Sequence, residues 1–320
     1  MSHSLKAGST PRIVVIGSIN CDFTTFVEDF PVKNQTVMAR QFSFNVGGKG
    51  LNQAVAAARF GADVSFVGCV GNDDFGRNAI EYMNGHGIDT SHVQVMENNS
   101  TGSAGIFVNS GGENMIAVTP GANAQLAPAL IDGAANLIAD SAVLLLQLEI
   151  PCESVGYALS MAKSHSVLSI LNPAPMLPTA RDIIAQADIV TPNETEMAEL
   201  FNDEDPSPAA PALEQVKNKA HKLVSAGVNS VITTLGAEGC LVYSANLAEH
   251  IPSHQVNVVD ATGAGDVFNG VLASCVADGQ SMQESSRLAV AAAAMSVEKE
   301  TVCDAAPSRK EVHEFLSERN

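Results

Sequence analysis

The stretch Asp260-Ala261-Thr262-Gly263-Ala264-Gly265-Asp266 opens a predicted helix. Apolar residues recur from Val267 to Val276 at spacings of one, three and four, which predicts one buried helix face. A small-residue turn before such a helix leaves backbone N–H groups free to attract anions, above all phosphate. Asp266 could take a proton there while these groups hold negative charge, which suits phosphoryl transfer to a hydroxyl. An isolated Gly-x-Gly-Asp, however, favours a plain turn and helix cap by roughly three to one.

Composition limits the class of protein. The chain has 320 residues, 46% of them apolar, and a formal net charge of −18. This acidic balance argues against nucleic-acid binding, because phosphate contacts need clustered Lys and Arg. The six cysteines form no Cys-x-x-Cys pair and are expected to be buried free thiols in a reducing compartment. No apolar run approaches a membrane span, so we expect a cytoplasmic protein without membrane contact, with a nuclear or organellar location left open.

Short β-branched runs alternate with segments of helical periodicity. This alternation predicts one α/β domain over residues 11–320, with a mainly parallel sheet covered by helices on both faces. The predicted strands are Arg12–Ile16, Val64–Val70, Ala142–Leu148, Val167–Leu171, Ile189–Thr191, Ser230–Thr234, Cys240–Tyr243 and Gln255–Val259. The predicted helices are Asn52–Phe60, Phe75–His86, Pro128–Ala139, Glu153–Lys163, Glu194–Phe201, Leu213–Ala226, Asp266–Val276, Gln283–Glu298 and Arg309–Glu318. Residues 1–10 are expected to be disordered, and residues 203–211 to form an exposed loop.

Two segments, residues 22–46 and 100–118, interrupt this alternation. Both alternate apolar and polar residues, and the second does so around the Gly111-Gly112 turn, which predicts a β-hairpin. We expect them to form a small β-sheet lid inserted in the α/β domain. Ordinary edge strands of the main sheet are the alternative.

Polar and glycine residues follow many of the predicted strands. Ligands of open α/β sheets bind beyond the carboxyl ends of the strands. The residues at those ends are Asn20, Asp22, Glu149, Asn172, Asn193, Glu196, Gly236, Gly239 and Asp260. One polar residue at a strand end is usually a helix cap, but six converging sets predict a ligand site.

The segment Gly47-Gly48-Lys49-Gly50-Leu51-Asn52 precedes a helix rich in small residues. It is not a Walker P-loop, because Ser43 stands where the first glycine would be and no Ser or Thr follows Lys49. Gly17-Ser18-Ile19-Asn20 likewise fails the dinucleotide fingerprint, which disfavours a Rossmann dehydrogenase. Paired glycines let the backbone approach a ligand, and the nearby Asn and Asp side chains suit a polyol.

Taken together, these motifs resemble the PfkB family of sugar kinases, and within it the ribokinases, over nearly the whole chain. The two family signatures match residues 47–54 and 260–270, and residues 147–149, 172–175 and 191–196 also match. The resemblance implies a ribokinase-like three-layer sandwich with a β lid that also pairs subunits into a homodimer. It implies ATP-dependent phosphorylation of D-ribose at O5, giving D-ribose 5-phosphate, with magnesium and potassium.

The resemblance implies roles for the matching residues. Asp266 would be the general base in a catalytic loop of Gly263, Ala264, Gly265 and Asp266, whose last three N–H groups would form the anion hole. Ribose would be held by Asn20, Asp22, Gly48, Lys49, Asn52, Glu149 and Asp266. ATP would be bound by Asn193, Thr234, Leu235, Gly236, Ala237, Glu238, Gly239, Gly265 and Val290. Potassium would be held by Asp260, Thr262, Ser296, Lys299 and Thr301, and magnesium through water by Glu196.

Two features depart from the family pattern. Val290 stands where ribokinases often carry Asn or His near the adenine site, and residues 299–303 lack a glycine that is usual in the potassium loop. The alternatives are another PfkB-family sugar or nucleoside kinase, or a non-catalytic sugar or nucleotide sensor on the same fold.

Overall fold

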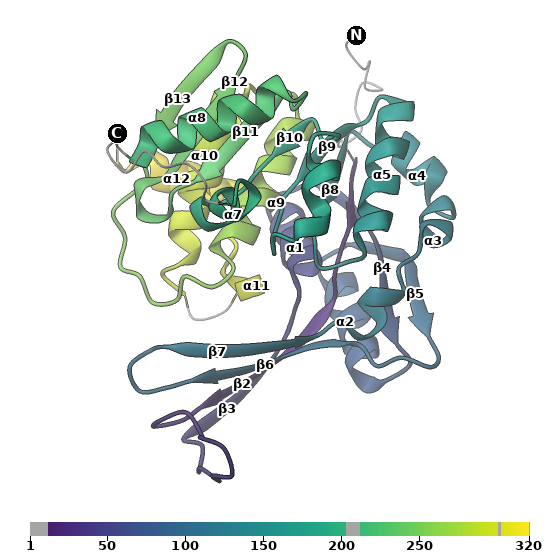
Figure 1. The fold of residues 1–320 in the computed structure, drawn as a ribbon, viewed down its shortest axis with the longest axis vertical. Coiled ribbons are helices and arrows are strands. Elements are labelled where there is room, and N and C mark those ends of the chain that lie inside the picture. Colours follow the sequence, from purple (N-terminus) through teal and green to yellow (C-terminus); the bar gives the residue numbers. More distant parts are fainter. Residues whose placement is uncertain (1–11, 203–211, 300–301, 320) are drawn as a thin grey trace.

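The computed structural model describes residues 12–202, 212–299 and 302–319. The predictions for residues 1–10 and 203–211 lie outside this range. The described chain contains two β-sheets (Figure 1). The larger sheet consists of β1 (Arg12–Ile16), β4 (Asp63–Gly71), β5 (Asp89–Met96), β8 (Val143–Leu146), β9 (Leu168–Leu171), β10 (Ile189–Val190), β11 (Ser230–Thr234), β12 (Cys240–Ser244) and β13 (Leu247–Ile251). The smaller sheet consists of β2 (Asn20–Phe26), β3 (Gln41–Gly47), β6 (Gly102–Val108) and β7 (Asn114–Thr119).

The larger sheet has the strand order β13-β12-β11-β10-β9-β8-β1-β4-β5. Its strands run parallel from β11 to β5, whereas β12 and β13 pair antiparallel at the other edge. This confirms the predicted mainly parallel sheet. Parallel strands need crossover connections, and the helices between them supply these while covering both faces.

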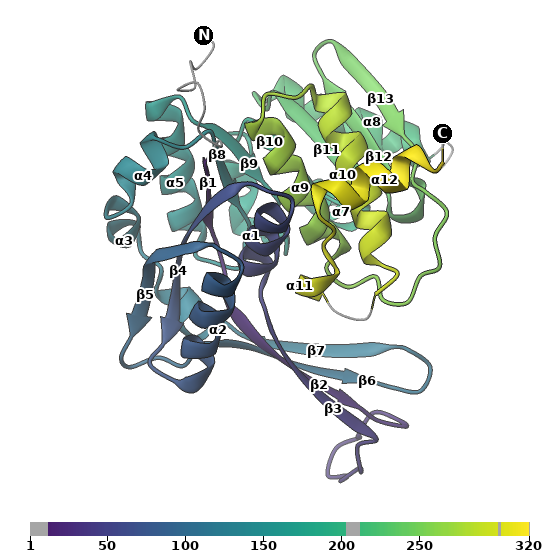
Figure 2. The ribbon, with the colours of Figure 1, turned by 180° about the vertical axis from the view of Figure 1, so that it is seen from behind.

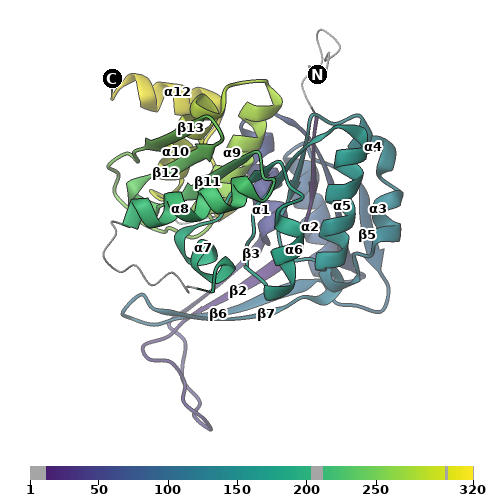
Figure 3. The ribbon, with the colours of Figure 1, turned by 45° about the horizontal axis from the view of Figure 1, so that its top comes forward.

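The helices form two outer layers (Figures 1, 2 and 3). One face carries α3 (Pro128–Asp132), α4 (Ala135–Ala139), α5 (Cys152–His165), α6 (Arg181–Ile184), α7 (Glu194–Leu200) and α8 (Ala212–Ser225). The other carries α1 (Lys49–Arg59), α2 (Asp74–Gly85), α9 (Ala264–Ala277), α10 (Met282–Ser296) and α12 (Arg309–Ser317), with the short α11 (Val302–Ala305) beside them. None of the described helices is long and apolar enough to cross a membrane.

Side-chain alternation along the central strand β1 divides the core in two. Ile13 and Val15 pack under α1 and α9, whereas Val14 and Ile16 face the opposite helix layer. All four are fully buried. Successive residues of a strand point to opposite faces, so a central strand covered on both sides reads as one continuous apolar run.

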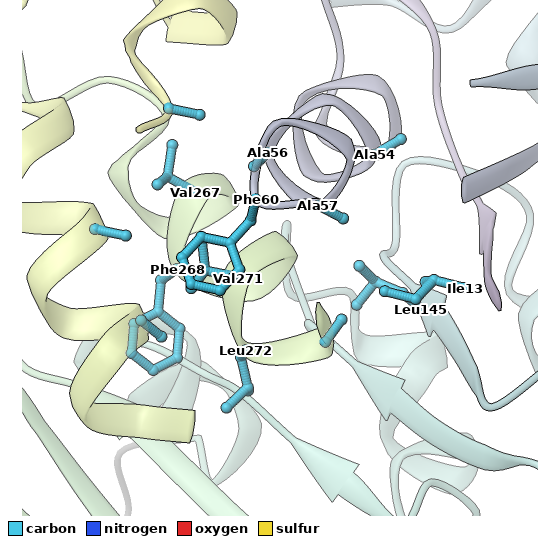
Figure 4. Close-up of a cluster of buried hydrophobic side chains, with 14 of the residues drawn as sticks. Ile13, Ala54, Ala56, Ala57, Phe60, Leu145, Val267, Phe268, Val271 and Leu272 are labelled. Carbon is cyan, nitrogen blue, oxygen red and sulfur yellow. The ribbon is translucent and has the colours of Figure 1, made fainter. Parts of the chain in front are cut away.

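The helices α1 and α9 lie against each other in the middle of the molecule. Figure 4 shows Ala56 of α1 and Phe60, which directly follows this helix, turned toward Val267 and Val271 of α9. Small side chains on α1 allow this approach, because a methyl group keeps two helix axes closer than a larger side chain would. The contact matters for function, since α1 and α9 carry residues of both family signatures.

The smaller sheet has the order β3-β2-β6-β7 and extends away from the helices (Figure 1). Only three residues separate β1 from β2, so the chain passes directly from one sheet into the other. The predicted hairpin around Gly111-Gly112 is confirmed as the antiparallel pair β6–β7. The strand-like segments therefore pair with one another and not as edge strands of the main sheet.

One predicted strand, Gln255–Val259, is wrong. The segment lies outside both sheets, and the backbone N–H groups of Val259 and Asp260 donate to the Val297 carbonyl at the end of α10. Its β-branched residues face solvent and a cleft, with Val258 and Val259 65% and 57% exposed. β propensity describes how a residue fits a packed pleat, and here no neighbouring strand offers one.

The remaining differences lie at the edges. The edge strands β5 and β13 have polar, mostly exposed faces that carry little apolar signal, and they were not predicted.

The predicted helix Pro128–Ala139 divides at Gly133 into α3 and α4. The described cysteines are free thiols, as predicted, and all are buried except the half-buried Cys152.

Gly270 tests the contact between α1 and α9. A Cβ at Gly270 would lie 2.5 Å from the Gln53 carbonyl oxygen and 2.7 Å from Ala56 Cβ. Gly270→Ala should therefore destabilise the protein by about 1–3 kcal/mol despite the better helix propensity of alanine. Gly85→Ala is the matched control, because it also lies in a helix but nothing is within 4 Å of its Cβ position. Chemical unfolding measures both, and equal stability of the two variants would contradict the close packing.

Candidate active site

The residues predicted to bind sugar gather at the carboxyl edge of the larger sheet. Asn20 and Asp22 follow β1, and Glu149 follows β8. Lys49 and Asn52 lie in the first turn of α1, next to the Asp266 carboxylate in the first turn of α9. The fold thus brings together residues that are more than 200 positions apart in the sequence.

Glu149 connects several of these residues. Its Oε2 accepts hydrogen bonds from Ser18 Oγ at 2.6 Å, the Lys49 backbone N–H at 3.1 Å and Asn20 Nδ2 at 3.5 Å. Because Lys49 begins α1, the carboxylate also meets the positive end of that helix. Gly48, which precedes Lys49, has a φ of 94°, and a Cβ at this position would lie 2.8 Å from the Asn20 backbone nitrogen. Only glycine permits this close approach.

Asn123, which the sequence analysis did not single out, orients Asn20. It is buried, and its Nδ2 donates to Asn20 Oδ1 at 2.8 Å and to the Ile19 carbonyl at 3.0 Å. Its Oδ1 accepts from the Ile19 N–H at 2.9 Å. These bonds fix the Asn20 amide so that its Nδ2 faces Glu149. The signal in the sequence was weak, because Asn123 is one polar residue among small ones.

Four carboxyl groups share the site with the Lys49 ammonium group. Burial, helped by the charges of Glu149 and Asp266, raises the pKa of Asp22 to about 6. Burial also raises the pKa of Glu196. It lowers the pKa of Lys49, but the surrounding carboxylates outweigh burial and hold that pKa above its usual value. The site therefore has an excess of acidic groups, which favours bound cations.

The Asp266 carboxylate is held by two adjacent residues of α1. Asn52 Nδ2 donates to its Oδ2 and Gln53 Nε2 to its Oδ1, both at 3.0 Å. These donors and Lys49 favour the ionised form, but burial is the larger effect and raises the pKa of Asp266. A carboxylate whose pKa lies above its usual value is a better proton acceptor, as a general base requires.

Two of the three N–H groups that were predicted to form the anion hole already have backbone acceptors at the start of α9. Among the described residues, the Gly265 N–H has no acceptor, whereas the Ala264 N–H donates to the Ala261 carbonyl at 3.3 Å. The Asp266 N–H donates to the Gly263 carbonyl at 2.9 Å, so the first turn is closed in the 3₁₀ manner. Gly263 makes this turn possible with a φ of 76°. Ala264 and Gly265 both line the neighbouring cleft.

That cleft has a volume of about 1040 Å³ and lies between the β11–β12 turn, residues 253–258 and helices α9 and α10. Its size suits a nucleotide. The residues predicted to bind ATP that line it are Asn193, Thr234, Gly236, Ala237, Gly239, Gly265 and Val290. The lining residues that the sequence analysis missed include His254, Val256, Phe268, Ala293, Ala294 and Arg319. Because residues 255–259 were predicted to form a strand, their position in the wall of the cleft was not expected.

Two residues predicted to bind ATP do not line the cleft. Leu235 is buried and packs with Val216 and Leu241. Glu238 is exposed, and its backbone carbonyl accepts a hydrogen bond from His250 Nε2 at 2.7 Å. Both lie in the turn after β11, where adjacent residues necessarily point in different directions. The prediction assigned the whole turn, but the structure brings only Gly236, Ala237 and Gly239 to the cleft.

The residues predicted to hold potassium lie in two adjoining segments. Asp260 Oδ1 accepts from the Thr262 N–H at 2.8 Å. The Val297 carbonyl accepts from the N–H groups of Val259 and Asp260, which brings the end of α10 against this loop. Ser296 is buried and donates to the Ala293 carbonyl, and Lys299 follows in the same turn. Thr301 lies outside the described residues.

Glu196, predicted to act on magnesium, belongs to a helix cap. Its Oε2 accepts from the Asn193 N–H, and Asn193 Oδ1 accepts from the Glu196 N–H, both at 2.8 Å. This reciprocal pair is a capping box at the start of α7. The charges of Lys49 and Asp266 both affect the pKa of Glu196, so its carboxylate lies close enough to act in the same site.

Comparison with known proteins is consistent with this geometry. A model of the pfkB family of carbohydrate kinases matches residues 10–309. A ribokinase of Schizosaccharomyces pombe is 40% identical over 309 residues, which cover 94% of this chain and 96% of the relative. A deoxyribokinase of Salmonella typhi is 35% identical over 95% of this chain and 98% of its own length.

A solved structure of similar shape is the ribokinase of Arabidopsis thaliana in complex with ribose and ATP. It has a TM-score of 0.88 and 30% identity, and the match covers 96% of this chain and 99% of that one. The family match spans both signature segments and includes Asp266. This chain belongs to the pfkB family of carbohydrate kinases.

Proposed function

We propose that this kinase transfers the γ-phosphoryl group of ATP to O5 of D-ribose, giving D-ribose 5-phosphate. The observation that carries the proposal is the position of Asp266 between a cluster of polar side chains, the proposed sugar pocket, and a nucleotide-sized cleft. Its carboxylate contacts Asn52 on the pocket side, while Gly265 beside it lines the cleft. The ribokinase relative and the ribokinase complex with ribose and ATP support these two substrates.

The pocket is suited to a small polyhydroxylated sugar. Asn20, Asp22, Asn52 and Glu149 offer amide donors and carboxylate acceptors, and Gly48 lets its own backbone lie close to that of Asn20. Carboxylates and amides together can bind adjacent hydroxyls as both donors and acceptors. Asp266 would deprotonate the primary hydroxyl, which then attacks the γ-phosphorus in line.

Charge on the transferring group would be met by the Gly265 N–H, by the positive end of α9 and by Lys49. Glu196 would hold magnesium through water, and the metal would neutralise phosphate charge. The excess of carboxyl groups over the Lys49 ammonium fits such a cation. Potassium would be held by Asp260 and Thr262 with carbonyls near Ser296 and Lys299. The hydrogen bonds to Val297 fit this assignment by drawing the two segments together.

The smaller sheet, with its segments 22–46 and 100–118, would serve as a lid and as a dimer interface. Its strand β2 carries Asn20 and Asp22, so closure of the sheet over sugar would complete the pocket and exclude water. Its exposed apolar side chains would pair two copies of the chain into a homodimer. They include Phe42, Met115, Ile116 and Val118, each more than half exposed.

The relative that is a deoxyribokinase makes 2-deoxyribose the second candidate substrate. Coupled ADP release with a panel of ribose, 2-deoxyribose, fructose, ketodeoxygluconate and adenosine distinguishes these possibilities. Ribose should give the highest kcat/KM. A higher value with another compound would overturn the substrate assignment. Binding of ribose and ATP without ADP release would identify a sensor.

Asp266→Asn should lower kcat by about a hundredfold or more, because the amide cannot accept the hydroxyl proton. ATP binding should be nearly unchanged, since the carboxylate is not part of the cleft wall. Ribose-dependent ADP release and ATP titration by calorimetry measure the two effects. A variant that phosphorylates ribose at a near-normal rate would exclude Asp266 as the base.

Asp22→Asn should stabilise the protein while weakening ribose binding. The folded-state pKa of about 6 lies above the value of about 3.9 in an unfolded chain. The ionised carboxylate therefore costs stability above pH 6, and this cost disappears as the pH falls toward 4. We expect the variant to have a higher Tm at pH 8, little change near pH 4.5 and a KM for ribose raised about tenfold or more. A lower Tm at pH 8 would contradict the electrostatic assignment.

Replacing potassium by sodium should depress turnover, because the proposed cation loop adjoins the first turn of α9. We expect an effect of about tenfold at saturating ribose and ATP, reversed by added potassium chloride but not by choline chloride. Choline chloride controls for ionic strength. Identical rates in both salts would remove Asp260 and Thr262 from the list of functional residues.

A further inference from the structure

Four buried polar side chains outside the residues assigned above link Asp266 to its own helix terminus. Gln53 Nε2 donates to Asp266 Oδ1 at 3.0 Å and to Asn172 Oδ1 at 3.1 Å. Asn172 Nδ2 donates to the Thr191 carbonyl at 2.9 Å. Each of these residues is at least nine-tenths buried, so their polar groups depend on one another for hydrogen bonds.

The chain of bonds then returns to the catalytic loop. Thr191 Oγ1 donates to Asn269 Oδ1 at 2.6 Å, and Asn269 Nδ2 donates to the Gly265 carbonyl at 2.8 Å. That carbonyl belongs to the same peptide unit as the Asp266 N–H. The bonds and the peptide link thus form a closed ring that contains both the carboxylate and the backbone of Asp266.

The orientation of the Gln53 amide is forced. Its Oε1 accepts from Gln147 Nε2 at 2.7 Å, so both its donors and its acceptor are used. Gln147 is fully buried, and its own Oε1 has no hydrogen-bond partner among the described residues. Leaving a buried acceptor unpaired is unfavourable. If the Gln147 amide were turned the other way, its oxygen would face the Gln53 oxygen. The observed orientation avoids this repulsion, although it leaves Gln147 Oε1 unpaired, and it keeps Gln53 Nε2 directed at Asp266.

We propose that Gln53 is a positioning residue for phosphoryl transfer, which fixes the plane of the Asp266 carboxylate and ties it to the Gly265–Asp266 peptide. This inference rests on the proposed role of Asp266 as the base. Gln53 is completely buried beneath that carboxylate, and its amide is fully engaged by Asp266, Asn172 and Gln147. Its effect on the reaction is therefore expected in kcat and not in the affinity for sugar.

The charged groups around Asp266 determine what loss of Gln53 would do. Lys49 of α1 favours the carboxylate, whereas Glu149 after β8, Asp22 of β2 and Glu196 of α7 oppose it. The Gln53 and Asn52 side chains add hydrogen bonds to the ionised form. Without the Gln53 donor, burial and the three carboxylates are opposed by one hydrogen bond fewer. The pKa of Asp266 should therefore rise further, and the group should ionise at a higher pH.

Gln53→Leu and the isosteric Gln53→Glu test the proposal. At pH 7 both should lower kcat about tenfold or more, and the acid limb of the kcat profile should move up by about one pH unit or more. The KM for ribose should stay within about threefold of wild type. A kcat profile with an unmoved acid limb in folded Gln53 variants would overturn the proposal, and so would an effect confined to KM.

Thr191→Val tests the far side of the ring, and it also decides the matter if the Gln53 variants do not fold. It removes the hydroxyl that orients Asn269 and should lower kcat about threefold to tenfold without moving the acid limb. Thr233→Val is the matched control, because Thr233 Oγ1 is buried on the neighbouring strand without a hydrogen-bond partner among the described residues. Equal kcat values for the two valine variants would contradict the ring.

The wild-type protein keeps this test separate from the proposed function. If wild type phosphorylates another sugar of the panel and not ribose, the substrate assignment fails, and the Gln53 profiles are measured with that sugar. If wild type phosphorylates ribose and the Gln53 variants match it at every pH, the substrate assignment stands and the positioning role fails.

Discussion

The site depends on one constraint: the buried Asp266 carboxylate must keep the hydrogen-bond donors that support its charge. Burial disfavours the charge of Asp266, and donors from α1 together with Lys49 partly offset this penalty. Those donors reach it only because α1 and α9 meet at Gly270, where a single methyl group would collide with the backbone. The close packing of α1 against α9 is therefore needed for the site as well as for the fold, since separating the helices would remove the hydrogen bonds that the Asp266 carboxylate needs.

The charges of the site act against the stability of the free protein. Burial raises the pKa values of Asp22, Glu196 and Asp266, and neighbouring carboxylates add to it, so keeping these groups ionised in the fold costs stability. Such a cost is typical of binding sites, where groups are arranged for a ligand and not for one another. Hydroxyl donors of a sugar and cations that accompany phosphate would relieve it, so substrate binding is expected to stabilise the protein.

Much of the fold could be predicted because its main signals are local. The buried strand β1 has a continuous apolar run and β11 is rich in β-branched residues, and the predicted bounds of both agree with the structure. Edge strands β5 and β13 lack that signal, and Gln255–Val259 carries it without having a neighbouring strand. The catalytic loop could be located from glycine spacing, but Gln53, Asn123 and Asn269 could not be given roles. Their roles arise from hydrogen bonds to residues 213, 103 and 78 positions away, which no local pattern encodes.

The short passage from β1 into β2 has a consequence for how such enzymes diversify. The Asp266 carboxylate and its supporting amides are anchored in the packed helices and strands of the main body, whereas Asn20 and Asp22 are carried on a strand that leaves it. Substitutions along the projecting sheet can therefore change the side chains around Asn20 and Asp22 while the hydrogen bonds to Asp266 stay the same. Residues of the smaller sheet and residues of the main body can therefore change independently during evolution.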